Sequence, residues 1–482
     1  MLAASLVCSL ILGVGDQRTP TFSDSQLNPF FRKCVATFEQ AEKLSAQKDY
    51  PAADKLLASF WEENPAGTEL WAMNYRIAGQ VSRETGINIG TPPCYYALRM
   101  MTESVAWRAK GGKVSPNAAE ATWTIVLVGK ANGLEPSSRA EIEQGKGTQT
   151  NYRLEPSLIR DNHAVIRQST QLFEEYVTAA TKGELKVKLQ FILLSDLDVP
   201  VESTWKERGF SGPTSEGWAQ IWKSIPARQK AATDWWWVIY PSAIPEKHDD
   251  FKTTEFVTGG MGTGPDGMSP CFIIDDRWLT RKPPHLGRGP YTDLERRVYL
   301  PQWLQHEFFH HLFRIYPEFA LEKTGHDWFN RSTWPSDFQG LIEPDYYAEA
   351  LTRRFQGSQP SLAHRLLYAA PDPALFAKIK LPDLLGTYRH EPKQNDWHEG
   401  EIRQDADGNL TWTNQAGRTW KLTNRISQGQ LATGPDCPYY NTNNPDQAAF
   451  KIVLQRDANG RHLPQAIGIS FAGGFYRKVL SK

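Results

Sequence analysis

The sequence predicts a multidomain α+β protein with a helical N-terminal region, a middle domain that combines a mixed sheet with helices, and a small C-terminal all-β domain. Changes of pattern along the 482 residues lead to this prediction. Apolar residues recur at intervals of three and four up to about residue 115, as in packed helices. Between residues 116 and 384, β-like runs alternate with helical stretches. From residue 385 to 482, short alternating runs are divided by turn residues, the pattern of a barrel or a sandwich.

The first element is an apolar segment, residues 1–15, that stops at Asp16. It is shorter than the roughly 20 apolar residues that cross a bilayer. Gly13 and Gly15 supply small residues at its end, so it fits the apolar core of a signal peptide, although no Lys or Arg precedes it. We therefore expect a secreted protein, extracellular or periplasmic, whose helical region spans 16–115. No other run in the sequence is apolar enough over that length, so no membrane span is expected.

The cysteines leave their pairing open. Removal of the apolar segment would take Cys8 with it and leave four, an even number that can pair in an oxidising compartment. Their positions, 34, 94, 271 and 437, exclude a compact zinc site built on Cys-x-x-Cys. Scattered buried thiols are an equally good interpretation, because free cysteines are among the most buried residues.

The remaining elements follow in chain order. Helical periodicity first appears near residues 38–44 and 52–61. The middle domain, 116–384, turns helical from 292 to 356; before that, strands are expected at 122–128, 185–194, 234–240 and 271–275, and helices at 164–179 and 214–223. In the C-terminal domain, 385–482, Asp-Gly and Ala-Gly turns predict hairpins, with strands over 402–413, 417–423, 467–471 and 474–479.

Composition restricts the possible partners. Hydrophobic residues make up 40% of the chain, and its 54 basic residues balance its 54 acidic ones. A neutral chain lacks general electrostatic attraction for nucleic acid, so no nucleic-acid partner is expected. The 17 tryptophans suit both cores and aromatic-lined surfaces. The rhythm of turns and tryptophans after residue 385 resembles the small lipocalin-like β-barrel of some secreted hydrolases, which implies packing against a catalytic domain or contact with a glycan.

The residues that point to chemistry are His306, Glu307 and His310, in the sequence His-Glu-Phe-Phe-His. Proline is tolerated at the first position of a helix, so Pro301 predicts a helix from 301 to about 316. That helix places the two histidines one turn apart on one face, where both imidazoles can reach one cation. Glu307 then points beside the metal and can take a proton from a water molecule that zinc acidifies. The competing interpretation, an ordinary surface helix, fits less well because the other faces are apolar.

This stretch resembles the zincin superfamily of zinc metallopeptidases. The match is tight over residues 301–316 and loose over 116–380, where a sheet precedes the helix. The resemblance implies a zinc cofactor (Zn2+), a peptide or protein substrate, and hydrolysis by a zinc-activated water with Glu307 as general base. Metzincins place a third histidine where this chain has Tyr316, followed by a helix-breaking proline, so that subclass is excluded.

The third zinc ligand is left open. Gluzincins take it from a glutamate on a later helix, and by this resemblance Glu343, at the start of a predicted helix, is the first candidate. Glu349, in the same predicted helix, is the second, although it could equally be an ion-pair partner of charged residues four positions away. Asp345 and His326 are further candidates, and the spacing of the residues does not decide between them.

A histidine and a pair of tyrosines are further candidates for catalysis. His326 could bind substrate or donate a proton, and Tyr346 or its neighbour Tyr347 could stabilise the oxyanion at the scissile carbonyl. Core packing is an equally good interpretation of the tyrosines. The alternative function is that of a non-catalytic zincin-like protein, or of a secreted protein that binds glycans or surfaces through its C-terminal domain.

Overall fold

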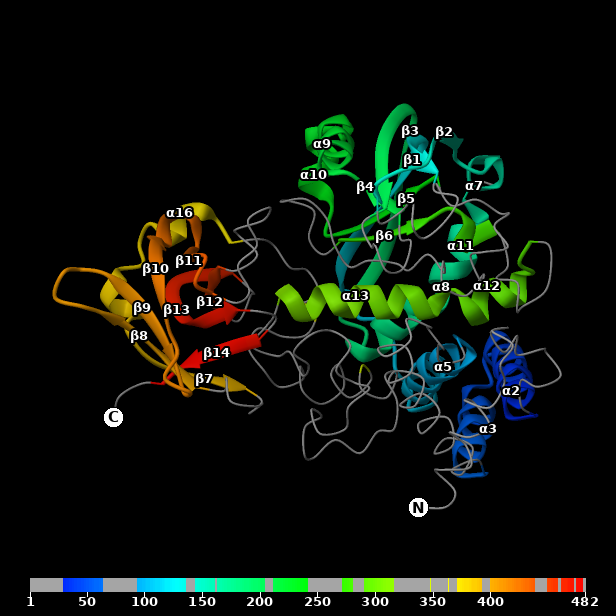
Figure 1. The fold of residues 1–482 in the computed structure, drawn as a ribbon. Coiled ribbons are helices and arrows are strands. Elements are labelled where there is room, and N and C mark those ends of the chain that lie inside the picture. Colours follow the sequence, from blue (N-terminus) through cyan, green and yellow to red (C-terminus); the bar gives the residue numbers. More distant parts are fainter. Residues whose placement is uncertain are drawn as a thin grey trace, which may run out of the picture.

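The structure is a computed structural model, and it describes residues 29–63, 93–135, 144–160, 163–203, 211–241, 271–280, 290–315, 347, 363, 371–391, 399–437, 449–457, 461–471 and 474–479. These residues form helices, a six-stranded sheet and a closed β-barrel (Figure 1). The predicted mixture of α and β structure is confirmed, and the C-terminal β-structure is a barrel rather than a sandwich. The predicted boundaries at residues 15, 115 and 384 stay predictions.

The six-stranded sheet is built around β1 (Ala119–Glu135), which pairs in parallel with β3 (Leu185–Ser203) on one side and with β5 (Trp235–Tyr240) on the other. The parallel part continues from β5 to β6 (Cys271–Asp275). Two short strands pair antiparallel with β1 and β3, respectively β2 (Thr148–Arg153) and β4 (Ser211–Pro213). The sheet is therefore mixed, with its long parallel strands at the centre.

Alternate residues of the central strands point to two different cores. On β5, Trp235 and Trp237 join one hydrophobic cluster, whereas Trp236 joins another on the opposite face. Every residue of β5 is buried, as expected for a parallel strand covered on both sides. The helices that cover the first face are α8 (Ala164–Ala180) and α13 (Pro301–Ile315), and α9 (Ser215–Ser224) covers the second.

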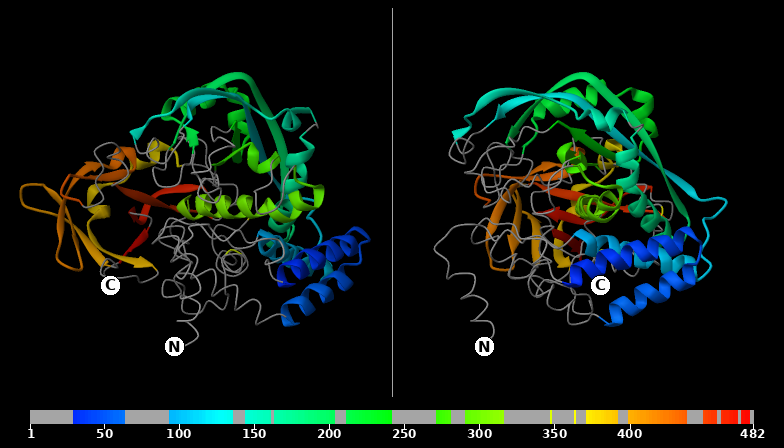
Figure 2. Two further views of the ribbon diagram at one scale, coloured as in Figure 1. Left: turned by 45° about the vertical axis from the view of Figure 1, so that its right-hand side comes forward. Right: turned by 90° about the vertical axis from the view of Figure 1, so that its right-hand side faces the viewer.

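Three helices of the N-terminal region complete the core on the side of α13 away from the sheet (Figure 2). They are α2 (Pro29–Ala46), α3 (Tyr50–Glu63) and α5 (Pro93–Ala109), which pack on one another, and α5 also contacts α8 and α13. Their buried residues belong to the same hydrophobic cluster as the sheet face that α13 covers. The N-terminal helices and the sheet therefore share one continuous core.

The barrel closes in the order β10-β11-β12-β13-β14-β7-β8-β9. The turn between β8 and β9 has the predicted Asp-Gly chemistry: Gly408 adopts a φ of 85°, and Asp405 Oδ1 accepts a hydrogen bond from the Asn409 amide at 2.8 Å. Trp412 and Phe450 pack in the interior, 5.0 Å apart between ring centroids. The strands are β7 (Gly386–Glu391), β8 (Glu399–Gln404), β9 (Leu410–Asn414), β10 (Thr419–Arg425), β11 (Gln430–Thr433), β12 (Phe450–Arg456), β13 (His462–Phe471) and β14 (Gly474–Lys478).

The lengths of two strands differ from the prediction. The sequence indicated strands at 122–128 and 185–194, but β1 and β3 run on to Glu135 and Ser203. Both continue past a register shift after Val128. The extension of β1 places small buried residues between polar ones, whereas that of β3 keeps apolar residues at Leu197, Val199 and Val201, an alternation that the predicted strand bounds left out. Among the described helices, none is long and apolar enough to cross a membrane.

Candidate functional site

The candidate site is built on α13, whose start is fixed by local sequence. The preceding helix, α12 (Asp293–Tyr299), has a complete capping box in which Thr292 Oγ1 accepts from the Glu295 amide and Glu295 Oε2 accepts from the Thr292 amide. After Leu300, Pro301 opens α13, which runs to Ile315. The predicted helix over 301 to about 316 is confirmed.

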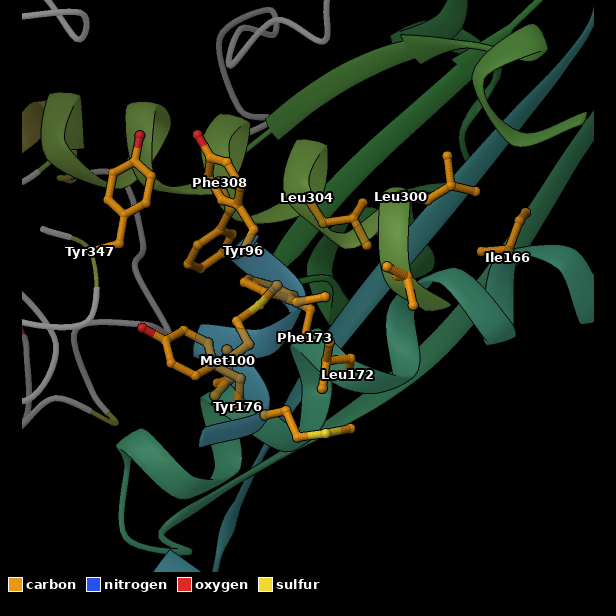
Figure 3. Packing of buried hydrophobic residues seen from close by; sticks show 14 of the residues in the cluster. Tyr96, Met100, Ile166, Leu172, Phe173, Tyr176, Leu300, Leu304, Phe308 and Tyr347 are labelled. Carbon is orange, nitrogen blue, oxygen red and sulfur yellow. The ribbon is translucent and has the colours of Figure 1, made fainter. Parts of the chain in front are cut away.

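Aromatic packing pins α13 to the sheet and to α8. Phe308 is buried and meets Trp235 of β5 edge-to-face at 4.9 Å. It also meets Phe173 of α8 at 5.3 Å (Figure 3). Leu304, one turn earlier, is buried in the same cluster. Because aromatic pairs of this kind fix ring orientation as well as distance, the rotation of α13 about its own axis is set by these contacts.

His306 and Glu307 lie side by side on this helix. His306 Nε2 and Glu307 Oε1 are 3.9 Å apart, and the two side chains are 13% and 6% exposed. The Trp303 ring lies one turn before His306, edge-on to its imidazole at 6.4 Å between centroids. A carboxylate this deeply buried requires compensation by a cation or by hydrogen bonds, and the adjacent imidazole is one such group. The pair is thus suited to hold a cation and to move a proton.

The other predicted site residues lie outside the described residues in whole or in part. The backbone of His310 belongs to α13, one turn after His306, but its side chain is not among those described. Glu343, Glu349, Tyr346 and His326 are also outside the described residues. Within the described ranges, no three His, Cys, Asp or Glu side chains are grouped so that they could hold a metal ion. Among these predicted zinc-binding and catalytic residues, His306 and Glu307 are therefore the two whose side chains the structure describes.

Tyr347 brings one point of the later segment against α13. It has helical conformation, is fully buried, and stacks on Phe309 with ring centroids 4.7 Å apart and planes 17° from parallel. Of the two interpretations offered for Tyr347, oxyanion stabilisation and core packing, this contact supports packing. Phe309 directly precedes His310 in the chain, so the contact lies next to the predicted zinc ligands.

Two buried aspartates near α13 were not among the site residues predicted from the sequence. Asp275 and Asp276 lie at the carboxyl end of β6, which α13 contacts, and both are buried. Asp276 Oδ2 accepts a hydrogen bond from the Glu155 amide at 3.1 Å, which ties β6 to the segment before α8. Acidic residues directly after an apolar run were the available signal, because functional groups in parallel sheets gather at the carboxyl ends of strands.

The sequence also gave no indication of a polar cluster where α13 packs against α8 and α5. Gln305 is fully buried and faces Tyr176 of α8. Burial raises the pKa of Tyr176 above its usual range, and the charge of Glu103 on α5 adds to this effect, whereas Arg99 and the contact with Gln305 oppose it. Glu103 also pairs with Arg99 at 3.3 Å. These polar side chains come from α5, α8 and α13 and lie where the three helices pack together, and helical periodicity alone gave no sign of them.

No family model, no curated protein and no solved structure matches this chain.

Proposed function

We propose that the protein is a secreted zinc-dependent metallopeptidase of the gluzincin-like type. The observation that carries the proposal is the buried pair of His306 and Glu307, 3.9 Å apart, in the His-Glu-Phe-Phe-His stretch of a regular helix. Burial of a charged glutamate among aromatic side chains costs free energy. A cation bound beside Glu307 and His306 would offset that cost. The donor set, imidazole with a carboxylate, suits zinc.

In the proposed mechanism the zinc ligands would be His306, His310 and a glutamate of the later segment. Glu343 is the first candidate for this third ligand and Glu349 is the second. Zinc, when bound there, would lower the pKa of water from its usual high value towards about 7 and polarise the scissile carbonyl. Glu307 takes the proton of the attacking water and returns it to the leaving amine. The buried position of Glu307 excludes bulk water, which strengthens its electrostatic interaction with the reacting atoms.

The stacking of Tyr347 on Phe309 supports a third ligand from the segment 343–349. Glu349 follows Tyr347 by two residues and Glu343 precedes it by four. Consecutive Cα atoms are about 3.8 Å apart, so neither glutamate's Cα can be further than about 15 Å from that of Tyr347. His326 and Tyr346 stay candidates for proton donation and for oxyanion stabilisation.

A glycan-binding role for the barrel finds no support in its described tryptophans. Trp412 and Trp420 are both buried in the barrel core, so neither offers its ring face to a sugar. We therefore place substrate binding on the α13 side of the molecule, with a peptide or protein as substrate.

The test replaces Glu307 with Gln in the full-length chain. Wild-type protein is expected to hold one zinc ion per chain and to cleave labelled casein in a chelator-sensitive manner. Glu307→Gln is expected to retain the zinc and lose at least about 10²-fold in kcat/KM, because only the general base is removed. Gln302→Ala, on the same helix, is the matched control and should retain both properties. Casein cleavage by Glu307→Gln at the wild-type rate, or a wild-type chain that binds no zinc, would refute the proposal.

A further inference from the structure

Two buried thiols meet between the N-terminal helices. Cys34 lies in the first turns of α2 and Cys94 is the second residue of α5, and the two helices pack on each other. Each cysteine is 1% exposed and lies within the same hydrophobic cluster, and the Cys34 side chain is close enough to that of Cys94 to raise the pKa of the Cys94 thiol beyond the effect of burial. Neighbouring thiols on two packed helices can be joined as a disulfide when their Cα atoms are about 4.4–6.8 Å apart.

The other described cysteines are elsewhere. Cys271 belongs to the core on the opposite face of the sheet, and Cys437 belongs to the barrel core. Each is buried in a cluster that contains no second cysteine of the described residues. The arrangement therefore favours one pairing among those that four cysteines allow.

We propose that Cys34 and Cys94 form a disulfide that fastens α2 to α5. The sulfur atoms join with loss of both thiol protons, and the two electrons reduce the disulfide of a small-molecule or protein oxidant to two thiols. Glutathione disulfide is such an oxidant, and an oxidising compartment supplies this class of reagent. The proposal does not depend on zinc chemistry at α13.

The position of Cys94 determines when the bond forms. Burial is the main cause that raises the pKa of this thiol, and the neighbouring Cys34 raises it further, whereas the amides of Cys94 and Tyr95 act in the opposite direction. The thiolate is the attacking species, so the folded, reduced protein should react slowly with an oxidant. Exchange is expected during folding, before α2 covers the site, and the finished bond is then shielded from reductants.

The bond would make the N-terminal helices a permanent part of the protein. Residues 64–92 connect α3 to α5, and a cut in this stretch would otherwise leave α2 and α3 with no covalent bond to the rest of the protein. With the disulfide in place, α2 stays on α5. It also keeps its contact with α12, where Arg297 Nη2 donates to Glu42 Oε2 at 3.1 Å, directly before the helix of the candidate site.

The first test maps the bond in the full-length protein, refolded in a glutathione redox buffer and digested with trypsin without reduction. The expected product joins residues 34–43 to residues 84–99 and weighs two hydrogen atoms less than the two peptides together. Cys94→Ser should abolish this product, and Cys271→Ala, the matched control, should retain it. Recovery of both peptides in free form only, or linked to Cys271 or Cys437 instead, would overturn the proposal.

The second test asks whether the bond holds the helices on the protein. A site for a specific protease is inserted after Gly67, in the connecting stretch, and the oxidised protein is cut there. On a denaturing gel the cut chain should run as one band without reductant and as two bands with it. Separation into two bands without reductant would contradict the proposal, whatever the activity of the protein.

Discussion

Replacement of Tyr347 by Ala tests whether the later segment supports the candidate site through its contact with α13. The Tyr347 ring is fully buried and stacks on Phe309 at 4.7 Å. Truncation of a buried aromatic side chain to Ala costs about 3–5 kcal/mol, of which the stacking accounts for about 0.5–1.5 kcal/mol. If a glutamate within a few residues is a zinc ligand, loss of the anchor should also weaken zinc binding by about 10- to 100-fold, as for other groups that orient ligands.

The matched control is Phe450→Ala in the barrel. Phe450 is equally buried and stacks on Phe471 with centroids 4.0 Å apart, so its removal should cost a similar 3–5 kcal/mol. Zinc affinity is measured by competition with a chromophoric chelator, and stability by chemical denaturation. The barrel variant should keep wild-type zinc affinity and kcat/KM, whereas Tyr347→Ala should lose both. Equal zinc affinity in the two variants would refute the reasoning that connects Tyr347 to the metal site.

The remaining predictions concern the N-terminal helices and the barrel. Cys94→Ser should lower the free energy of unfolding by about 4 kcal/mol relative to the oxidised protein, the value expected for a loop of roughly 60 residues, and reduced wild type should show no such difference in chemical denaturation. Burial, with the nearby charge of Arg456, lowers the pKa of His462 to about 4, below the value near 6.5 of an unfolded chain. The unfolded chain therefore takes up a proton first as pH falls from about 6.5 to 4, so the urea midpoint of the barrel should fall over this window, and His462→Asn should flatten the slope. Gly400→Ala would drive a methyl group into the ring of Trp412 and should cost about 1–3 kcal/mol in thermal denaturation of the barrel.

Local chemistry made the helices and turns predictable. The Thr292 to Glu295 capping box and Pro301 are short-range signals, and both mark helix starts in the structure. The Gly408 turn of the barrel is read in the same way, because few other residues adopt a positive φ. The full extent of β1 was not predictable, since its second half is defined by pairing with β2 and β3 rather than by its own alternation.

The candidate site was only partly predictable for a related reason. Neighbours on one helix, His306 and Glu307, follow from helical geometry, which the sequence encodes directly. The contact of Tyr347 with Phe309 joins two segments far apart in the chain, and no periodic rule reaches across that distance. The same holds for Cys34 and Cys94, since four cysteines allow several pairings and only the packing of α2 on α5 distinguishes between them.

The packing around α13 indicates that the N-terminal helices are a permanent part of the protein and not a removable propeptide. One side of α13 is fixed by Phe308 against the sheet and α8, and α5 packs against it as well. α5 carries Tyr96 and Met100, both fully buried in the core that Phe308 shares. An inhibitory propeptide has to leave without exposing the core of the domain it covers, and departure of α5 would expose apolar surface at a cost of about 25 cal/mol per Å². Since a functional helix needs its orientation fixed before substrate arrives, we infer that α5, with α2 fastened to it, serves as scaffold for the site on α13.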